Sequence, residues 1–149
     1  MIETERLTNA DEALLHTLAE IERECFSAPL DAAQIGRLLR DENTRWLLAR
    51  SGGEAAGYVW VQTVLDEGYI GNVAVRQALR RQGIGDRLLR ELDALAAEEK
   101  LRFLTLEVRS GNEPAKALYR KHGYAETGLR RNYYTAPRED ALLMTKEYE

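Results

Sequence analysis

The segment from Tyr69 to Val108 constrains the fold more than any other part of the sequence. An apolar strand is predicted at Tyr69–Val75, a long amphipathic helix at Gly83–Lys100, and a second, nearly continuous apolar strand at Leu101–Val108. Two strands joined by a crossover helix pair in parallel, with a right-handed connection. The apolar run of the second strand also predicts burial on both of its faces.

The remaining elements alternate in type, which predicts an α/β or α+β fold rather than an all-α or all-β fold. Glycine-containing turns at 51–54 and 65–68 indicate antiparallel neighbours around the parallel pair. The further predicted strands are Ile2–Leu7, Arg45–Arg50, Ala56–Val64, Tyr124–Leu129 and Ala141–Lys146. The further predicted helices are Asp11–Phe26, one capped by Asp31, and Glu113–His122 after an Asn112 cap.

Composition excludes several classes of function. A chain of 149 residues fits one domain, 1–149, and 44% hydrophobic residues suffice for a core. The net charge of −4 argues against direct nucleic-acid binding. One cysteine, Cys25, and two histidines leave no disulfide and no metal site. Without an apolar run for a membrane span or signal peptide, we expect a soluble cytoplasmic protein.

The loop Arg80–Gly85 is typical of an anion site. Unpaired amides at a helix N-terminus carry partial positive charge, and glycines allow a ligand to approach the backbone. The alternative is that the glycines serve tight packing and the arginines are solvated. The loop lacks the Lys-Ser/Thr of a P-loop and the third glycine of a dinucleotide fingerprint. The arginines near it, against Asp86 alone, are Arg76, Arg80, Arg81, Arg87 and Arg90.

Two side chains are candidates for acid–base chemistry. Glu107 lies near the end of the buried strand, where a carboxylate is costly unless it is solvated or functional. Tyr119 lies on the helix that follows Asn112. Each also has a structural explanation, since Glu107 could pair with Arg109 or with a backbone amide, and Tyr119 could be a core tyrosine.

These residues together resemble the GNAT superfamily of N-acetyltransferases over essentially the whole chain, and more finely the RimI-type enzymes. The finer resemblance rests on Val64–Glu67 and on the blocks 130–134 and 138–141. The residues that resemble the superfamily are Tyr69-Ile70-Gly71-Asn72-Val73-Ala74-Val75, Arg80-x-x-Gly83-x-Gly85, Leu106-Glu107-Val108-Arg109, Asn112, Ala117-Leu118-Tyr119 and Gly123-Tyr124.

The resemblance implies a mixed, mostly antiparallel sheet of six to seven strands, splayed at its centre and flanked by four helices. Acetyl-CoA is expected in the opening, with its pantetheine arm along one strand and its diphosphate on the glycine-loop amides. The residues implied for the cofactor are Val73, Ala74, Val75, Arg80, Arg81, Gln82, Gly83, Ile84, Gly85, Asp86 and Asn112.

The resemblance also implies that Glu107 is the general base and Tyr119 the general acid of a direct transfer in a ternary complex. An N-terminal amine, with a pKa near 7.7–8.0, costs about 1–1.4 kcal/mol to deprotonate at pH 7, whereas a lysine costs about 4.6 kcal/mol. A carboxylate can therefore assist an α-amine more easily. We expect Cys25 to fill the core rather than carry the acetyl group, and His16 and His122 to lie at the surface.

The implied acceptor is the N-terminal alanine of small-subunit ribosomal protein eighteen, and proteins of tRNA threonylcarbamoylation are implied as further partners. One departure concerns the acceptor: RimI-type enzymes have Phe-Pro-Trp-Ser after the first helix, whereas this chain has Phe26-Ser27-Ala28-Pro29-Leu30. Trp46 and Trp60 are instead expected on core strands. Alternatives are a GNAT enzyme for lysine side chains, polyamines, amino acids or drugs, a non-catalytic acyl-CoA-binding module, and a nucleotide-binding regulator.

Overall fold

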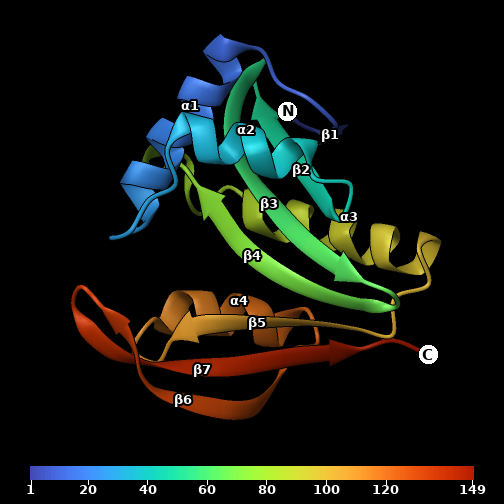
Figure 1. Ribbon diagram of the computed structural model, residues 1–149, viewed down its shortest axis with the longest axis vertical. Coiled ribbons are helices and arrows are strands. Elements are labelled where there is room, and N and C mark those ends of the chain that lie inside the picture. The colour runs from blue at the N-terminus through green and yellow to red at the C-terminus, as the bar shows by residue number, and fades with distance from the viewer.

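Seven strands form one sheet in the order β1-β2-β3-β4-β5-β7-β6 in the computed structural model, which describes residues 1–149 (Figure 1). The strands are β1 (Ile2–Leu7), β2 (Thr44–Ser51), β3 (Glu54–Val64), β4 (Glu67–Val75), β5 (Phe103–Arg109), β6 (Ala125–Thr135) and β7 (Arg138–Glu147). The helices are α1 (Glu12–Cys25), α2 (Ala32–Arg40), α3 (Ile84–Glu98) and α4 (Glu113–Lys121), with a 3₁₀ turn at Gln77–Leu79.

The central pair, β4 and β5, is parallel, and every other pair is antiparallel. The two strands pair only from Glu67 to Tyr69 on β4, opposite Phe103 to Thr105 on β5, and then diverge (Figure 1). This confirms the predicted crossover and the predicted splay of the sheet. Each strand therefore has an unpaired edge where the two separate.

An irregularity in β4 lies at the point of divergence. The register between β3 and β4 shifts after Trp60, so that Gly71 has no partner, as in a β-bulge. A Cβ at Gly71 would overlap the Trp60 indole, so only glycine fits there. Bulges bend the strand that contains them, and this one lies two residues after the last β4–β5 pair.

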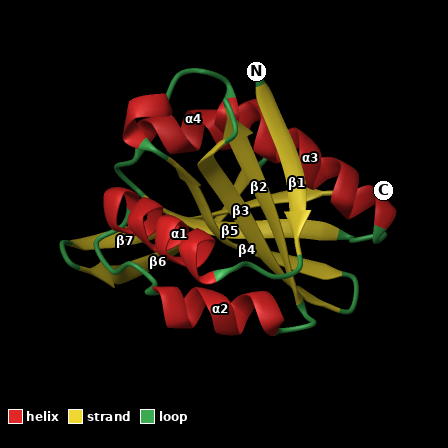
Figure 2. Cartoon of the chain, turned by 90° about the horizontal axis from the view of Figure 1, so that it is seen from above, coloured by secondary structure: helices red, strands yellow, loops and turns green.

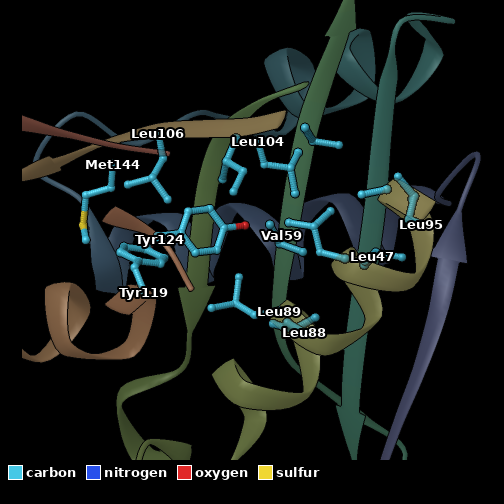
Figure 3. Close-up of a cluster of buried hydrophobic side chains, with 14 of the residues drawn as sticks. Leu47, Val59, Leu88, Leu89, Leu95, Leu104, Leu106, Tyr119, Tyr124 and Met144 are labelled. Atoms are coloured by element: carbon cyan, nitrogen blue, oxygen red, sulfur yellow. The ribbon is translucent and has the colours of Figure 1, made fainter. Parts of the chain in front are cut away.

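Helices cover both faces of the sheet, with α1 and α2 on one face and α3 and α4 on the other (Figure 2). The core under α3 and α4 contains Leu88 and Leu89 of α3, Leu104 and Leu106 of β5, and Tyr119 of α4 (Figure 3). A separate core under α1 and α2 contains the buried Trp46, which stacks on Trp60 with 5.7 Å between ring centroids. The two tryptophans are on strands, as predicted.

Local sequence signals explain where the helices begin. Asp11 caps α1, Asp31 forms a capping box with Gln34 at α2, and Asn112 caps α4 with Pro114 in its first turn. The predictions of these starts are confirmed. No helix is long and apolar enough to cross a membrane.

Two predictions about strands were incomplete or wrong. The last two strands extend well beyond Tyr124–Leu129 and Ala141–Lys146, into a hairpin whose tip is mostly exposed. Backbone pairing rather than apolar alternation maintains that part of the hairpin. Burial on both faces of β5 was wrong: Leu104, Leu106 and Val108 are buried, while the alternate residues are only partly covered.

Candidate active site

A cavity of about 510 Å³ opens where β4 and β5 diverge. Both strands contribute to its wall, together with α4, the loop after α1 and the β6–β7 hairpin. The lining residues are 25–28, 70–73, 106–109, Asn112, Ala115, Tyr119, Tyr133, Tyr134 and Pro137. Glu107, Tyr119, Asn112 and Val73, four of the residues predicted for the site, are thus brought to one cavity.

The two candidate catalytic residues reach the cavity from opposite faces of the sheet. The buried residues of β5 face α3 and α4, so Glu107, between Leu106 and Val108, points to the face that carries α1 and α2. Tyr119 belongs to α4 and packs in the core on the other face, beside Tyr124 (Figure 3). A group that spans the opening would therefore have a carboxylate on one side and a phenol on the other.

The Glu107 carboxylate is held loosely. Arg130 Nε lies 3.4 Å from Oε1, and the Tyr133 hydroxyl donates to Oε2 at 3.5 Å. The side chain is 32% exposed, so solvent or a substrate can reach it. The carboxylate can therefore accept a proton without first breaking a strong ion pair. The alternative in which Glu107 pairs with Arg109 does not hold, because Arg109 pairs with Glu139 at 3.2 Å.

Tyr119 is buried and keeps its proton. Burial, and to a lesser degree the proximity of Tyr134, raises the pKa of Tyr119 above its usual value of 10.0. No side chain or carbonyl of the protein accepts a hydrogen bond from its hydroxyl, while the ring packs edge-on against Tyr124 at 5.8 Å. The hydroxyl is thus a proton donor without a protein partner.

Tyr134 is a functional candidate to which the sequence analysis assigned no role. It lines the cavity, and the Arg109 guanidinium lies 4.3 Å from the centroid of its ring. Burial, followed by the charge of Glu107, raises the pKa of Tyr134 to about 12. The signal in the sequence was the Tyr133-Tyr134 pair within the RimI-like block, which identified the segment but not a role.

The glycine loop lies outside the cavity and has the backbone geometry of an anion site. Gly83 is the N-cap of α3 with φ of 83°, and Arg81 is also left-handed with φ of 63°. No side chain caps α3, and the amides from Arg81 to Asp86 donate to no protein acceptor. Free amides of this kind at a helix N-terminus suit a diphosphate, so the residues present fit the pyrophosphate of coenzyme A.

Several residues near the loop have roles other than those expected. Gly85 packs against α4, since an added Cβ would lie 3.0 Å from Leu118 Cδ2. Asp86 accepts from His122 Nε2 at 2.8 Å, and this bond lowers the pKa of Asp86. The prediction that His122 lies at the surface was therefore wrong. His122 links α3 and α4, and only 10% of its side chain is exposed.

The arginine cluster is less free than its charge suggests. Arg76 pairs with Glu24 at 2.7 Å, and Arg87 pairs with Glu91 at 3.2 Å. Arg80 Nε donates to the Val75 carbonyl at 3.2 Å. Two of the five arginines are thus neutralised by helix carboxylates, and a third donates to the main chain.

Cys25 does not simply fill the core, because it lines the cavity. Its thiol donates to the Val75 carbonyl at 3.4 Å, and Arg80 Nη2 lies 3.5 Å from the sulfur. Burial raises the pKa of Cys25, so the thiol form is favoured and the residue is a poor nucleophile. Cys25 is the last residue of α1, and the end of this helix brings it here, a placement that distance along the sequence did not reveal.

The loop after α1 is fastened to the β6–β7 hairpin across the cavity mouth. Arg109 Nη2 donates to Ser27 Oγ at 3.0 Å, and Arg109 Nη1 donates to the Pro137 carbonyl at 2.8 Å. Asn112 lines the cavity while its side chain accepts from the Ala115 amide at 3.2 Å. No group of three or more histidine, cysteine, aspartate or glutamate residues is arranged to hold a metal ion.

A parallel strand pair that opens into a cavity, followed by uncapped amides at the start of the crossover helix, defines an acetyltransferase of the GNAT type. The sequence profile described as the Acetyltransferase (GNAT) family matches residues 12–124, and the chain belongs to this family.

Individual relatives narrow the resemblance. The chain is 36% identical over 147 residues to N-alpha-acetyltransferase RimI of Mycobacterium tuberculosis, covering 95% of this chain and 89% of that protein. It is 34% identical over 132 residues to the ribosomal protein bS18-alanine N-acetyltransferase of Haemophilus influenzae, covering 85% and 88%. The crystal structure of the Escherichia coli ribosomal-protein-S18-alanine N-acetyltransferase superposes with a TM-score of 0.87 at 31% identity, covering 99% of this chain and 94% of that chain.

Proposed function

We propose that this RimI-like protein transfers the acetyl group of acetyl-CoA directly to the α-amine of the N-terminal alanine of ribosomal protein bS18. The observation that carries the proposal is the placement of Glu107 and Tyr119 on opposite sides of one opening in the sheet. The names of the Haemophilus influenzae relative and of the Escherichia coli structure supply the acceptor. A ribosomal acceptor places the reaction in the cytoplasm.

The two sides of the opening correspond to the two substrates. The side with Tyr119, Asn112 and Ala115 belongs to α4 and its cap, and α3 with its free amides covers the same face of the sheet (Figure 2). We assign this side to acetyl-CoA, with the unpaired edge of β4 at Val73 along the pantetheine arm. The side with Phe26, Ser27 and the hairpin is left for the acceptor peptide.

Each residue then has one task in the transfer. Acetyl-CoA supplies an acetyl group activated as a thioester. Glu107 accepts, directly or through a water, the proton that the α-amine loses as its nitrogen bonds to the carbonyl carbon. Tyr119 donates its proton to the sulfur as the carbon–sulfur bond breaks, so that coenzyme A leaves as the neutral thiol. Backbone amides near Val75 polarise the carbonyl.

The acceptor side favours a chain terminus. The mouth of the cavity is narrowed where the loop after α1 is joined to the hairpin. Hydrogen bonds from Arg109 to Ser27 and to the Pro137 carbonyl make this connection. The absent loop tryptophan leaves the smaller residues Ser27 and Ala28 in the wall, so we expect some tolerance of first residues larger than alanine.

Mass spectrometry of a peptide panel tests the proposal. The protein is incubated with acetyl-CoA and peptides that start with the bS18 sequence, differ in the first residue, or contain an internal lysine. We expect acetylation at the α-nitrogen, strongest for alanine, and none on a peptide whose α-amine is blocked. Modification confined to lysine ε-nitrogens, or equal activity on free small amines, would overturn the acceptor assignment.

A further inference from the structure

A buried carboxylate lies behind the acceptor side of the cavity. Glu22 of α1 is fully buried, and no cation pairs with it. Three donors point at it instead: the Tyr58 hydroxyl, the Leu30 amide at 2.9 Å, and Asn72 Nδ2 at 3.0 Å. A buried carboxylate is retained only where such hydrogen bonds compensate it, so this arrangement is specific rather than incidental.

The donors establish that Glu22 is the acceptor in every bond. Burial, and then the charge of Glu22, raises the pKa of Tyr58, so its hydroxyl keeps the proton and donates. The Leu30 amide can only donate. Both Glu22 oxygens are hydrogen-bond acceptors. The Asn72 group that faces Glu22 is therefore the NH₂ donor and not the carbonyl oxygen.

This bond fixes the direction of the other Asn72 atom. The side-chain amide is planar, so with Nδ2 held on Glu22 the carbonyl oxygen Oδ1 is directed away from α1. No protein donor reaches Oδ1, the atom is not sealed in the interior, and Asn72 lines the cavity. A free hydrogen-bond acceptor in a defined orientation therefore faces the cavity.

Asn72 and Glu107 lie on the same side of the opening. Asn72 reaches α1, and Glu107 points to the face of the sheet that α1 and α2 cover. Tyr119 lies on the opposite face. The free oxygen is thus on the acceptor side and not on the side assigned to acetyl-CoA.

The chemistry of an amine nucleophile requires a second acceptor at this place. A neutral primary amine attacks with its lone pair and retains two N–H groups, of which the base takes one proton. We propose that Asn72 Oδ1 accepts a hydrogen bond from the other N–H of the acceptor amine, and that Glu22 is the positioning residue that sets the orientation of the Asn72 amide. The inference rests on the proposed function for the identity of the amine.

Three variants test the inference. Asn72→Ala removes the acceptor oxygen, Glu22→Gln removes the carboxylate that orients it, and Tyr58→Phe removes a different donor from the same carboxylate. For Asn72→Ala we expect kcat/KM for the acceptor to fall about tenfold, the effect of losing one buried hydrogen bond, with KM for acetyl-CoA unchanged. Glu22→Gln should also lower kcat/KM for the acceptor, whereas Tyr58→Phe should leave kcat/KM for the acceptor unchanged.

Kinetics are measured on whichever amine of the panel the wild-type protein acetylates best. Failure of the bS18 assignment then appears in the wild-type panel, whereas failure of the present inference appears in the ratio of variant to wild type. The role of Asn72 would be overturned if kcat/KM for the acceptor were unchanged in Asn72→Ala, or if KM for acetyl-CoA rose by a similar factor. Thermal unfolding of each variant identifies loss of structure, and if Glu22→Gln is unfolded, Asn72→Ala alone decides.

Discussion

Glu107 and Tyr119 line one cavity because two strands separate, and not because either residue has unusual surroundings. On a continuous sheet, Glu107 and the ring of Tyr119 would be divided by paired backbone. Because β4 and β5 stop pairing after Tyr69 and Thr105, one cavity reaches both side chains. Access to both candidate catalytic residues from one cavity therefore depends on the local absence of hydrogen bonds between the two strands.

Replacing Glu107 should affect the chemistry and not the fold. Glu107→Gln keeps the size of a side chain that is 32% exposed but removes its basicity. We expect kcat/KM for the acceptor to fall by about 10²–10⁴, the usual contribution of a general base, with unchanged binding of acetyl-CoA. Steady-state kinetics check this, and Glu126→Gln, on an exposed ion pair with Arg120, is the matched control. Equal losses in both variants would contradict the role.

The pH dependence of activity follows from the acceptor amine and Tyr119. Activity should rise as the α-amine, with a pKa near 7.7–8.0, is deprotonated. Because burial raises the pKa of Tyr119 above 10.0, the phenol stays protonated and no alkaline decline should appear by about pH 9. Tyr119→Phe should lower the plateau by about 10² without shifting the rise. The control is Tyr124→Phe, which removes a buried hydroxyl outside the cavity and should retain the plateau. A decline of wild-type activity below pH 9 that disappears in Tyr119→Phe would contradict this role of Tyr119.

At the scale of elements, the crossover from β4 to α3 joins the strand edge to the glycine loop, the two segments that we propose bind acetyl-CoA. Gly83 and Gly85 contribute differently. Gly83 allows a left-handed N-cap in open space, and Gly85 allows α4 to approach α3 at Leu118. The sequence alone left ligand approach and helix packing as alternatives, and Gly85 shows that packing is a substantial part of the answer.

A comparison of Gly83→Ala with Gly52→Ala distinguishes the effect of backbone strain on stability from an effect on acetyl-CoA binding. Both glycines have positive φ, 83° and 60°, and neither has an atom within 4 Å of an added Cβ. Each substitution should therefore cost about 1–2 kcal/mol of stability, measured by urea unfolding. Only Gly83→Ala should raise KM for acetyl-CoA, because Gly52 lies in the turn between β2 and β3. A similar KM in both variants would mean that the loop does not hold the diphosphate.

The predictability of each element depended on how local its determinants are. The starts of α2 and α4 were predicted because capping by Asp31 and Asn112 is decided within a few residues. The parallel crossover was predicted because its handedness and pairing are general rules. The hairpin tip could not be delimited, because its exposed side chains carry no apolar alternation.

The candidate site was only partly accessible to sequence reasoning. Glu107 and Tyr119 stood out through the resemblance and lie at the cavity, although their catalytic roles stay predictions. Cys25, Asn72 and Tyr134 could not be placed there, because the splay brings together segments distant in sequence. The partners that bind Asn72 and neutralise the arginines are likewise decided by tertiary packing.

At the scale of the whole molecule, two separate cores lie on opposite faces of the opened sheet, and the core under α3 and α4 spans both of its halves. One core lies under α1 and α2, and the other lies under α3 and α4 and continues across β5 to β7. Phenols are buried in both, at Tyr58 in the first core and at Tyr119 and Tyr124 in the second. The stability of the molecule should therefore report on the ionisation of tyrosine.

Stability should decline in alkali. Burial raises the pKa of Tyr58, Tyr119 and Tyr124 in the folded state above the unfolded value of about 10. Above pH 10 the unfolded chain loses these protons first, so each tyrosine lowers the free energy of unfolding by about 1.4 kcal/mol per pH unit. Urea unfolding between pH 8 and 11 measures the slope, and Tyr124→Phe should reduce it by about one proton. A flat profile above pH 10 would contradict the burial of these phenols.

The central claim is that acetyl transfer takes place in the opening between β4 and β5, with the diphosphate of the cosubstrate on the amides of residues 81–86. A crystal structure of the protein with bound coenzyme A measures this directly. The account predicts the pantetheine arm along the free edge of β4, its thiol between Glu107 and Tyr119, and phosphate oxygens on those amides. Coenzyme A bound elsewhere, or β4 and β5 paired continuously beyond Tyr69, would contradict it.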